Sequence, residues 1–275
     1  GDATDPVEVY GLDGTAYTIQ YGQYSAAGVF SADAGVKDYA KDGSTPWYEQ
    51  FKAITIAGTS YILNQTKTAA MGAATTSGAL TGTVQTFADL PGAPTVGDIY
   101  KIVGDDTSGV DDYYMIYTSS SVWVETVAPG IEYQIDNTTM PHRLLKTGAT
   151  TFTFADIDWG ERPVGNTDSN PDPTFIGQKI RNLFYFKNRL GFLSKDNVIM
   201  SQAGGAYNFF RTSMLNLLDD DVIDVSSAVS ARALVDLYWV IPFDRDLLMS
   251  ARSQQLNLSS GSSPLTPTTV TINPT

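Results

Sequence analysis

The sequence predicts an all-β protein built mainly from antiparallel meanders. Short runs rich in Val, Ile, Tyr, Phe and Trp alternate with Gly, Asn, Asp, Ser and Pro turn residues along most of the chain. Apolar residues make up 42% of the 275 residues and aromatic residues 11%, a composition that can bury a core and is unlike that of a disordered chain. Two similar strand–turn–strand–turn–strand segments in the second half further predict repeated, partly propeller-like blades.

The first predicted domain, residues 1–82, contains two hairpins. β-prone runs flank Asp13-Gly14, and a second pair of runs flanks Gly58. Residues 47–53 are short enough to be either helical or extended. Ala, Thr, Gly and Ser dominate residues 66–82 without periodicity, which is typical of a linker, so we place a domain boundary there.

The second predicted domain, residues 83–130, is a small inserted β module. Its strands are aromatic and β-branched and are separated by Gly, Asp and Ser turns; they cover residues 97–103, 112–117 and 122–127.

The third predicted domain, residues 131–275, consists of β-propeller-like blades. Apolar residues at every second position predict strands at 133–137, 140–146 and 151–154, whereas the Asn-, Asp- and Pro-rich stretch 165–173 predicts a loop. Residues 180–201 and 237–259 each read as a three-strand meander. Their similarity indicates a blade repeat, and chance similarity between two hairpins is the alternative.

Composition excludes several functions. The net charge of −13 disfavours tight binding to nucleic-acid phosphates, so a DNA partner would pass rather than stay bound. The absence of cysteine excludes disulfides, thiol nucleophiles and thiolate metal centres. We find no apolar run near the ~18 residues that a membrane span needs and no leader pattern at the start. The first residue is not Met and the last residues read as a strand, so we expect a piece of a longer chain.

His142 is the only histidine, so any histidine base, catalytic triad or histidine metal site must use it. The sequence has neither a Gly-x-Ser-x-Gly nucleophile motif nor a Gly-Lys pair for a phosphate-binding loop. A packed, structural histidine is therefore the favoured interpretation, and no cofactor is implied.

Acidic residues suggest two further sites, each with a simpler structural reading. The run Asp219–Asp221 with Asp224 offers paired carboxylates of the kind glycosidases use, but a solvated turn or blade edge is favoured. Asn166, Asp168, Asn170 and Asp172 have the spacing of calcium ligands. Because Pro171 stands where a calcium loop has its turn glycine, an Asx-rich turn is the favoured reading.

Aromatic residues of the inserted module allow a sugar-binding platform. The candidates are Tyr113, Tyr114, Tyr117 and Trp123. Aromatic residues in small sheets more often form the core, which is the interpretation we favour.

The segment Asp158–Gly177 and the two segments Asn188–Ser194 and Asn197–Gln202 resemble the tail tubular protein B, or tail nozzle, family of short-tailed bacteriophages. The family pattern is Trp-Gly-acid-Arg, an Asn-Pro loop, a Phe-x-Gly and an Asn-Arg-Leu-Gly-Phe. It is matched here by Trp159, Gly160, Arg162, Asn170, Pro171, Phe175, Gly177, Asn188, Arg189, Leu190, Gly191 and Phe192. The likeness covers most of the chain outside 83–130, while family members are considerably longer.

The resemblance implies a non-enzymatic structural protein of the virion tail. It implies a hexameric ring below the adaptor ring (tail tubular protein A), attachment of tail fibres, and a channel that conducts DNA during ejection into the host. From the residue types, Trp159 is expected to anchor the fold, and Arg162 and Arg189 to tie loops together through bidentate hydrogen bonds. The rival hypotheses are a tail-associated hydrolase of glycan or peptidoglycan and a carbohydrate-binding module at 83–130.

Overall fold

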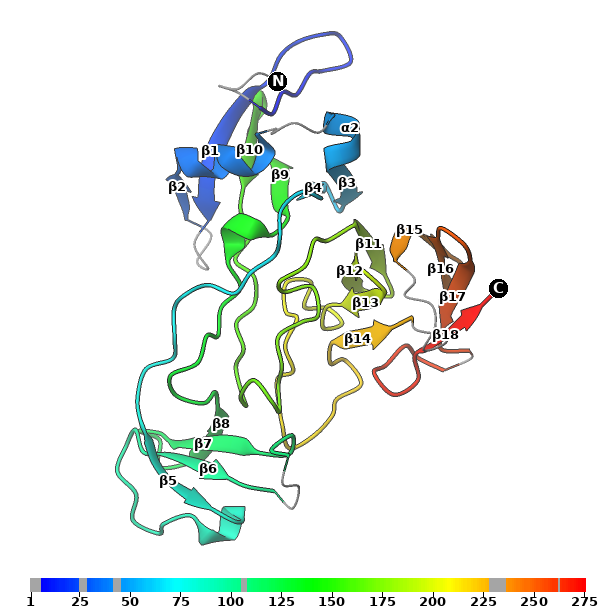
Figure 1. The fold of residues 1–275 in the computed structure, drawn as a ribbon. Coiled ribbons are helices and arrows are strands. Elements are labelled where there is room, and N and C mark those ends of the chain that lie inside the picture. The colour runs from blue at the N-terminus through cyan, green and yellow to red at the C-terminus, as the bar shows by residue number, and fades with distance from the viewer. Residues whose placement is uncertain (1–5, 25–28, 42–45, 105–107, 228–235, 262) are drawn as a thin grey trace.

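The computed structural model describes residues 6–24, 29–41, 46–104, 108–227, 236–261 and 263–275, and they form a mainly β structure. The strands make one six-stranded and three four-stranded sheets (Figure 1). Helical structure in these ranges is limited to short segments, of which the first two are continuous: η1 Ala34–Val36, α1 Lys37–Ala40, α2 Trp47–Gln50, η2 Phe87–Asp89 and η3 Asn137–Thr139. No helix in the described part of the chain has the length and apolarity needed to span a membrane. The predicted all-β class is confirmed.

The six-stranded sheet has the strand order β2-β1-β10-β9-β4-β3. Its strands are β1 Thr18–Tyr24, β2 Phe30–Ala32, β3 Phe51–Ile56, β4 Thr59–Asn64, β9 His142–Lys146 and β10 Thr151–Ala155. The hairpin predicted around Gly58 is confirmed, with α2 directly before its first strand. β1 and β10 pair in parallel, whereas the other neighbouring strands of this sheet pair in antiparallel fashion. β1 and β10 are far apart in the sequence, and no local turn specifies how they pair.

Of two further elements expected in this region, one is present in short form and one is wrong. Around Asp13-Gly14 the turn forms with Gly14 at a φ of 83°, and the flanking runs pair through an antiparallel bridge between Tyr10 and Ala16 and a 2.9 Å hydrogen bond from the Tyr17 amide to the Val9 carbonyl. Residues 133–137 form no strand, because Asp136 caps η3 by accepting a 3.0 Å hydrogen bond from the Thr138 amide. Capping and tertiary pairing decide these two segments more than their local alternation does.

The inserted module forms a four-stranded sheet at the opposite end of the molecule from the six-stranded sheet (Figure 1). Its strands are β5 Leu80–Val84, β6 Ile99–Ile102, β7 Tyr113–Tyr117 and β8 Trp123–Thr126, and β5 pairs with β6 in parallel. The strand β5 is not predicted by the sequence and begins inside the expected linker. We call residues 75–76 and 130–132 the neck, because Thr75 bridges Glu132 and the Gly130 amide donates to the Thr76 carbonyl at 3.0 Å. The six-stranded sheet takes strands from both sides of this insert, so it combines the first and third predicted domains.

Two consecutive meanders follow. The first is β11 Asn182–Phe186, β12 Arg189–Ser194, β13 Asn197–Met200 and β14 Ile223–Ser226; the second is β15 Leu237–Phe243, β16 Asp246–Ala251, β17 Gln255–Ser259 and β18 Thr271–Pro274. Both predicted three-strand meanders are confirmed, and each has a fourth strand that the sequence analysis missed. The described residues do not close into a propeller, so the blade interpretation stays a proposal.

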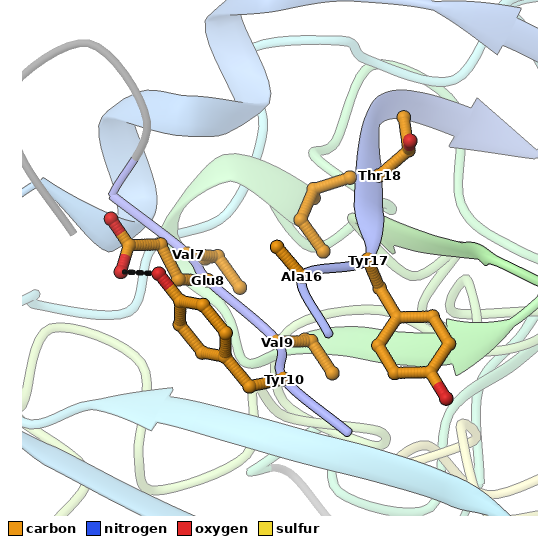
Figure 2. Close-up of a pocket in the computed structure, with 8 residues that line it drawn as sticks. Val7, Glu8, Val9, Tyr10, Ala16, Tyr17 and Thr18 are labelled. Carbon is orange, nitrogen blue, oxygen red and sulfur yellow. Dashed lines mark hydrogen bonds between the residues drawn. The ribbon is translucent and has the colours of Figure 1, made fainter. Parts of the chain in front are cut away.

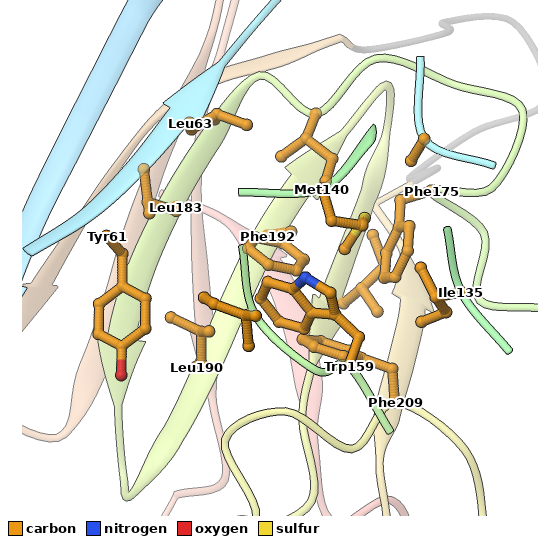
Figure 3. Close-up of a cluster of buried hydrophobic side chains, with 14 of the residues drawn as sticks. Tyr61, Leu63, Ile135, Met140, Trp159, Phe175, Leu183, Leu190, Phe192 and Phe209 are labelled. Atoms are coloured by element: carbon orange, nitrogen blue, oxygen red, sulfur yellow. The ribbon is translucent and has the colours of Figure 1, made fainter. Parts of the chain in front are cut away.

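Two hydrophobic clusters lie on opposite faces of the first meander. One contains Trp159, Phe175, Phe192 and Phe209 (Figure 3). The other lies between the two meanders and joins Phe184, Phe186, Leu193, Val198, Met200 and Ile223 to Leu237, Leu247, Met249, Leu256 and Leu258. The outward side of the second meander instead exposes Trp239, Ile241, Phe243 and Leu248.

Candidate functional site

The motif tryptophan lies in the larger hydrophobic cluster. Trp159 is buried, with ring centroids 5.8 Å from Phe192 and 5.9 Å from Phe209 (Figure 3). The next residue, Gly160, donates its amide to the Tyr207 carbonyl at 2.7 Å, and a Cβ there would lie 2.9 Å from the Asn208 Cα. Only glycine fits at this backbone crossing without displacement, so the Trp-Gly pair joins residues 159–160 tightly to residues 207–209.

Arg162 is completely enclosed and binds two separate segments of the chain. Its Nε donates to the Asn170 carbonyl at 2.8 Å, Nη1 donates to the Glu132 carbonyl at 2.6 Å, and Nη2 pairs with the Asp172 carboxylate. A buried guanidinium needs such partners because an unsatisfied charge is very costly away from water. Arg162 therefore joins the neck to the Asn-Pro loop.

Arg189, in β12, binds a cluster of backbone carbonyls. Nη1 donates to Ser201 at 2.8 Å and to Asp221 at 2.6 Å, and Nη2 donates to Asp219 at 3.0 Å. Longer contacts reach the carbonyls of Asp220 at 3.2 Å and Leu265 at 3.5 Å. One side chain thus connects a strand with two loops and with the segment that precedes β18.

The remaining motif residues are turn and packing positions around these arginines. Asn170 is buried and donates from Nδ2 to the carbonyls of Val164 and Arg211, both at 3.0 Å, and Pro171 follows it in the loop. Gly177 has a φ of 75°. Asn188, with a φ of 61°, accepts a 2.6 Å hydrogen bond from the Tyr185 hydroxyl in the turn between β11 and β12. The Phe184 ring covers Gly191 so closely that a Cβ there would lie 2.1 Å from it.

Together these residues form a buried frame rather than a reactive centre. Both guanidiniums face carbonyl oxygens, and Arg162 also pairs with the Asp172 carboxylate, so the donors of both arginines are held in structural contacts. The pKa of Arg189 is lowered, because burial disfavours the charged guanidinium more than the nearby Asp220 and Asp221 favour it. Such an arrangement can lock loops in place, and we see no proton-transfer chemistry in it.

The residues of this frame lie in a segment that matches a known protein family. A family model described as "Bacteriophage nozzle protein" matches residues 76–275, which include every motif residue. The chain belongs to the bacteriophage nozzle protein family. A curated relative, the tail tubular protein gp12 of Escherichia phage T7, is 39% identical over 190 residues, covering 69% of this chain and 24% of that protein. The nozzle-family chain therefore spans about a quarter of the length of the relative it matches. The resemblance predicted from the sequence is confirmed.

The histidine of the nozzle-family chain is packed in the six-stranded sheet. His142 stacks on Tyr39 with centroids 4.0 Å apart, and its Nδ1 lies 2.9 Å from the Met140 carbonyl oxygen. Burial lowers the pKa of His142 to about 4. Among the described residues the ring contacts the Tyr39 and Phe154 rings and the Met140 carbonyl, so the geometry favours a structural histidine.

The acidic candidates have structural partners. Asp219–Asp221 offers its backbone carbonyls to Arg189, and the Asp221 side chain is buried with Oδ2 accepting from the Leu218 amide at 2.8 Å. Asp224, in β14, accepts from the Thr174 amide at 2.8 Å and from the Thr174 hydroxyl at 2.7 Å. These carboxylates fix loops to the first meander.

The calcium-like spacing belongs to an Asx turn. Asn166 Oδ1 accepts from the amides of Asp168 at 2.9 Å and Ser169 at 2.8 Å. Asn170 and Asp172 are bound to Arg211 and Arg162. No cluster of three His, Cys, Asp or Glu residues suited to a metal ion occurs in the described ranges.

The aromatic residues of the insert divide between the two sides of its sheet. Tyr114 is buried, and its hydroxyl accepts from Asn166 Nδ2 at 3.3 Å. Trp123 packs against Tyr117 at 5.2 Å and Tyr100 at 5.7 Å between ring centroids. Tyr113 is only partly exposed. These contacts place the rings in packing roles, and a sugar platform has no support from them.

A groove near the N-terminal turn is lined by Val7–Tyr10 and Ala16–Ile19 (Figure 2). Its volume is about 340 Å³, and the Tyr10 hydroxyl donates to Glu8 at 3.1 Å on its wall. Glu8 is the only carboxylate among the lining residues. A glycosidase needs two carboxylates, and this groove supplies one.

Sequence reasoning missed residues 207–211. Phe209 stacks on Phe192 at 5.0 Å, Tyr207 donates to or accepts from Tyr61 at 2.9 Å, and the Arg211 amide donates to Asn170. The segment reads Tyr-Asn-Phe-Phe-Arg, and this aromatic run shortly after the Gly-Gly pair at 204–205 was the available signal.

Proposed function

We propose that this chain forms part of a hexameric nozzle that conducts DNA out of a short-tailed phage. As a member of the nozzle family it is a structural component of the phage tail, located in the virion. The observation that carries the proposal is the family match over residues 76–275, which contain the frame of Trp159, Arg162 and Arg189. The gp12 relative is named as a tail tubular protein, which supports assembly into a tube.

The charge suits passage of a polyanion. With 17 basic and 30 acidic residues, the chain repels DNA on average and so lowers the affinity of any transient contact. In the proposed assembly the partners are neighbouring copies, the adaptor ring formed by tail tubular protein A, and the tail fibres. Ring formation also covers sheet edges that an isolated chain leaves open.

The two meanders are consecutive blades in this proposal. They pack face to face through the cluster of Phe184, Val198, Leu247 and Leu258, which is how neighbouring propeller blades bury their faces. The outward side of the second meander remains apolar at Trp239, Ile241 and Phe243, as a further blade-like neighbour would require.

The decisive experiment measures assembly. Purified chain is examined by solution mass and negative-stain imaging at micromolar concentration, alone and with the adaptor ring. We expect six-fold rings, alone or on the adaptor. A chain that stays monomeric and ignores the adaptor argues against the proposed assembly.

We also propose that the chain has no catalytic activity. Incubation with peptidoglycan and capsular glycan should release no more reducing ends than a heat-unfolded sample. Release that is abolished by substitution of one carboxylate pair would overturn this part of the proposal.

A further inference from the structure

A polar pocket of about 300 Å³ lies where four segments of the chain meet. It is lined by Thr68 from the expected linker, by Gln178, Lys179 and Arg181 just before β11, by Lys195 from the turn between β12 and β13, and by Asp236 just before β15. We call it the cationic pocket. Three of its side chains carry positive charge and one carries negative charge, so its local charge is opposite in sign to that of the chain as a whole.

Among the described residues, no carboxylate forms an ion pair with the three cations. The ion pairs found among the described residues involve Lys41, Lys101, Arg162 and Arg211, and none of the pocket cations has a described carboxylate within 4.0 Å. In a chain with an excess of acidic residues, three unpaired cations around one cavity leave a local site for an anion.

Backbone contacts hold the cations in place. Thr68 and Lys179 form an antiparallel bridge, and the Arg181 amide donates to the Leu193 carbonyl at 2.7 Å. The Lys195 carbonyl accepts from the Leu237 amide at 2.7 Å, and Lys195 has a left-handed φ of 51°. The pocket rim is therefore built from fixed backbone, and only the side-chain ends must order when a ligand binds.

The chemistry of the lining residues selects a phosphoryl oxyanion. An arginine fork offers two parallel donors to oxygen atoms of a phosphate, and lysine ammonium groups add point charge. Thr68 and Gln178 supply neutral groups that can hydrogen-bond to the remaining oxygens. We propose that the cationic pocket binds a phosphoryl group through Lys179, Arg181 and Lys195.

If the proposed function holds, this phosphoryl group belongs to the backbone of DNA in transit. The surrounding acidic surface keeps the affinity low, so contacts would be brief and would leave the strand free to move. The phosphate site itself stands without that assumption, because inorganic phosphate has the same recognition chemistry.

The test compares two variants that lose the same charges. The pocket variant is Lys179→Gln/Arg181→Gln/Lys195→Gln. The control is Lys146→Gln/Lys187→Gln/Arg245→Gln, whose three residues are exposed and lie outside the pocket. A single Lys195→Gln variant is included because it changes only an exposed turn side chain if the triple variant does not fold.

In the first arm, thermal unfolding is followed with inorganic phosphate and with chloride at equal ionic strength. Saturating phosphate should raise the Tm of the unmodified chain and of the control by about 2–4 °C and should leave the pocket variant unchanged. Lys195→Gln should show a smaller rise than the unmodified chain. No phosphate-specific rise, or an equal loss in the control, overturns the proposal.

The second arm measures anisotropy of a labelled oligonucleotide at 50 and 200 mM salt. The pocket variant should bind at least about tenfold more weakly at low salt and should lose salt dependence, because each phosphate contact contributes to the slope. Binding of phosphate without any pocket-dependent oligonucleotide binding overturns DNA as the source while keeping the phosphate site. Failure of ring assembly, by contrast, bears on the proposed function alone.

Discussion

The two four-stranded meanders have the same topology but different surroundings. In the first, β12 is buried along its whole length, because one face packs on Trp159 and Phe175 and the other on the second meander. In the second, only Leu237 of β15 is buried and the last three residues of the strand are exposed, since only one face of this meander is covered. Similar strand patterns therefore do not imply similar burial: the number of neighbouring layers decides it.

The largest effect is expected from Phe192→Ala in β12. Phe192 is fully buried between Phe175 and Phe209, so the variant leaves a cavity in the rigid centre of the molecule. We expect a loss of about 4 kcal/mol in the free energy of unfolding, measured by urea titration. A loss below about 1 kcal/mol would contradict the two-sided burial of this meander.

The second-largest loss of stability is expected from Arg189→Met. It removes the donors for the buried carbonyls of Ser201 and Asp221 while keeping similar side-chain volume. We expect a loss of about 3 kcal/mol, because buried acceptors are left unsatisfied. Arg189→Lys keeps one charged donor and should recover part of this loss; equal stability of the two variants would show that the carbonyl contacts contribute little.

Leu258→Ala tests the covered face of the second meander. Leu258 is fully buried, but its sheet has a free outer side that can relax inward. We therefore expect a loss of about 2–3 kcal/mol in the free energy of unfolding, measured by urea titration, which is at the lower end for such substitutions. A loss larger than that of Phe192→Ala would reverse the comparison.

Unfolding at low pH tests whether the meanders and the six-stranded sheet unfold together. The six-stranded sheet contains His142, whose protonation destabilises it. The unfolded histidine takes up a proton near its ordinary value of 6.5, whereas burial lowers the folded pKa to about 4. The unfolded state thus binds more protons between these values, and His142 lowers stability as pH falls through 6.5 towards 4.

We expect this histidine to lower the free energy of unfolding by about 2 kcal/mol between pH 8 and pH 5, relative to a His142→Phe variant at the same pH. The comparison with the variant cancels the opposite effect of Asp156, whose pKa burial raises to about 6. If tryptophan fluorescence and near-UV circular dichroism give different midpoints at pH 5, the sheets unfold separately.

The smallest effect is expected from Phe243→Ser on the outward side of β15. Phe243 is 65% exposed, so removal of its ring should change the free energy of unfolding by no more than about 0.5 kcal/mol. A matched Leu247→Ser variant, at the buried neighbouring position, should be strongly destabilised. If Phe243→Ser is as damaging, the outward side is covered in solution.

Local features of the fold were predictable because their signals are local. Gly58 and the Lys187-Asn188 pair mark hairpins whose two strands adjoin in sequence, and both hairpins are present. The parallel pairing of β1 with β10 was not predictable, because no turn or spacing encodes it.

The buried frame was predictable only in part. Trp159, Arg162 and Arg189 stood out through their motif, but their partners are mostly backbone carbonyls, which any residue type can supply. Asp221 is the clearest example, because an acidic run reads as solvated in the sequence and yet its end is buried beneath Arg189. Side-chain identity cannot show which carbonyl a distant arginine will reach.

The neck is the place where the inserted module leaves and rejoins the rest of the chain. Thr75 and Glu132 are bridged, and Thr76 is hydrogen-bonded to both Gly130 and Ile131, so the chain leaves and returns at almost the same place. The inserted sheet pairs only within itself, so the other three sheets take no strand from it. Its contacts with the rest of the chain nevertheless extend beyond the neck, because Val127 bridges Gly165, Glu125 accepts from the Met214 amide and Tyr114 accepts from Asn166. A domain grafted between the two sides of the neck would meet little cost in closure entropy but would have to replace these contacts.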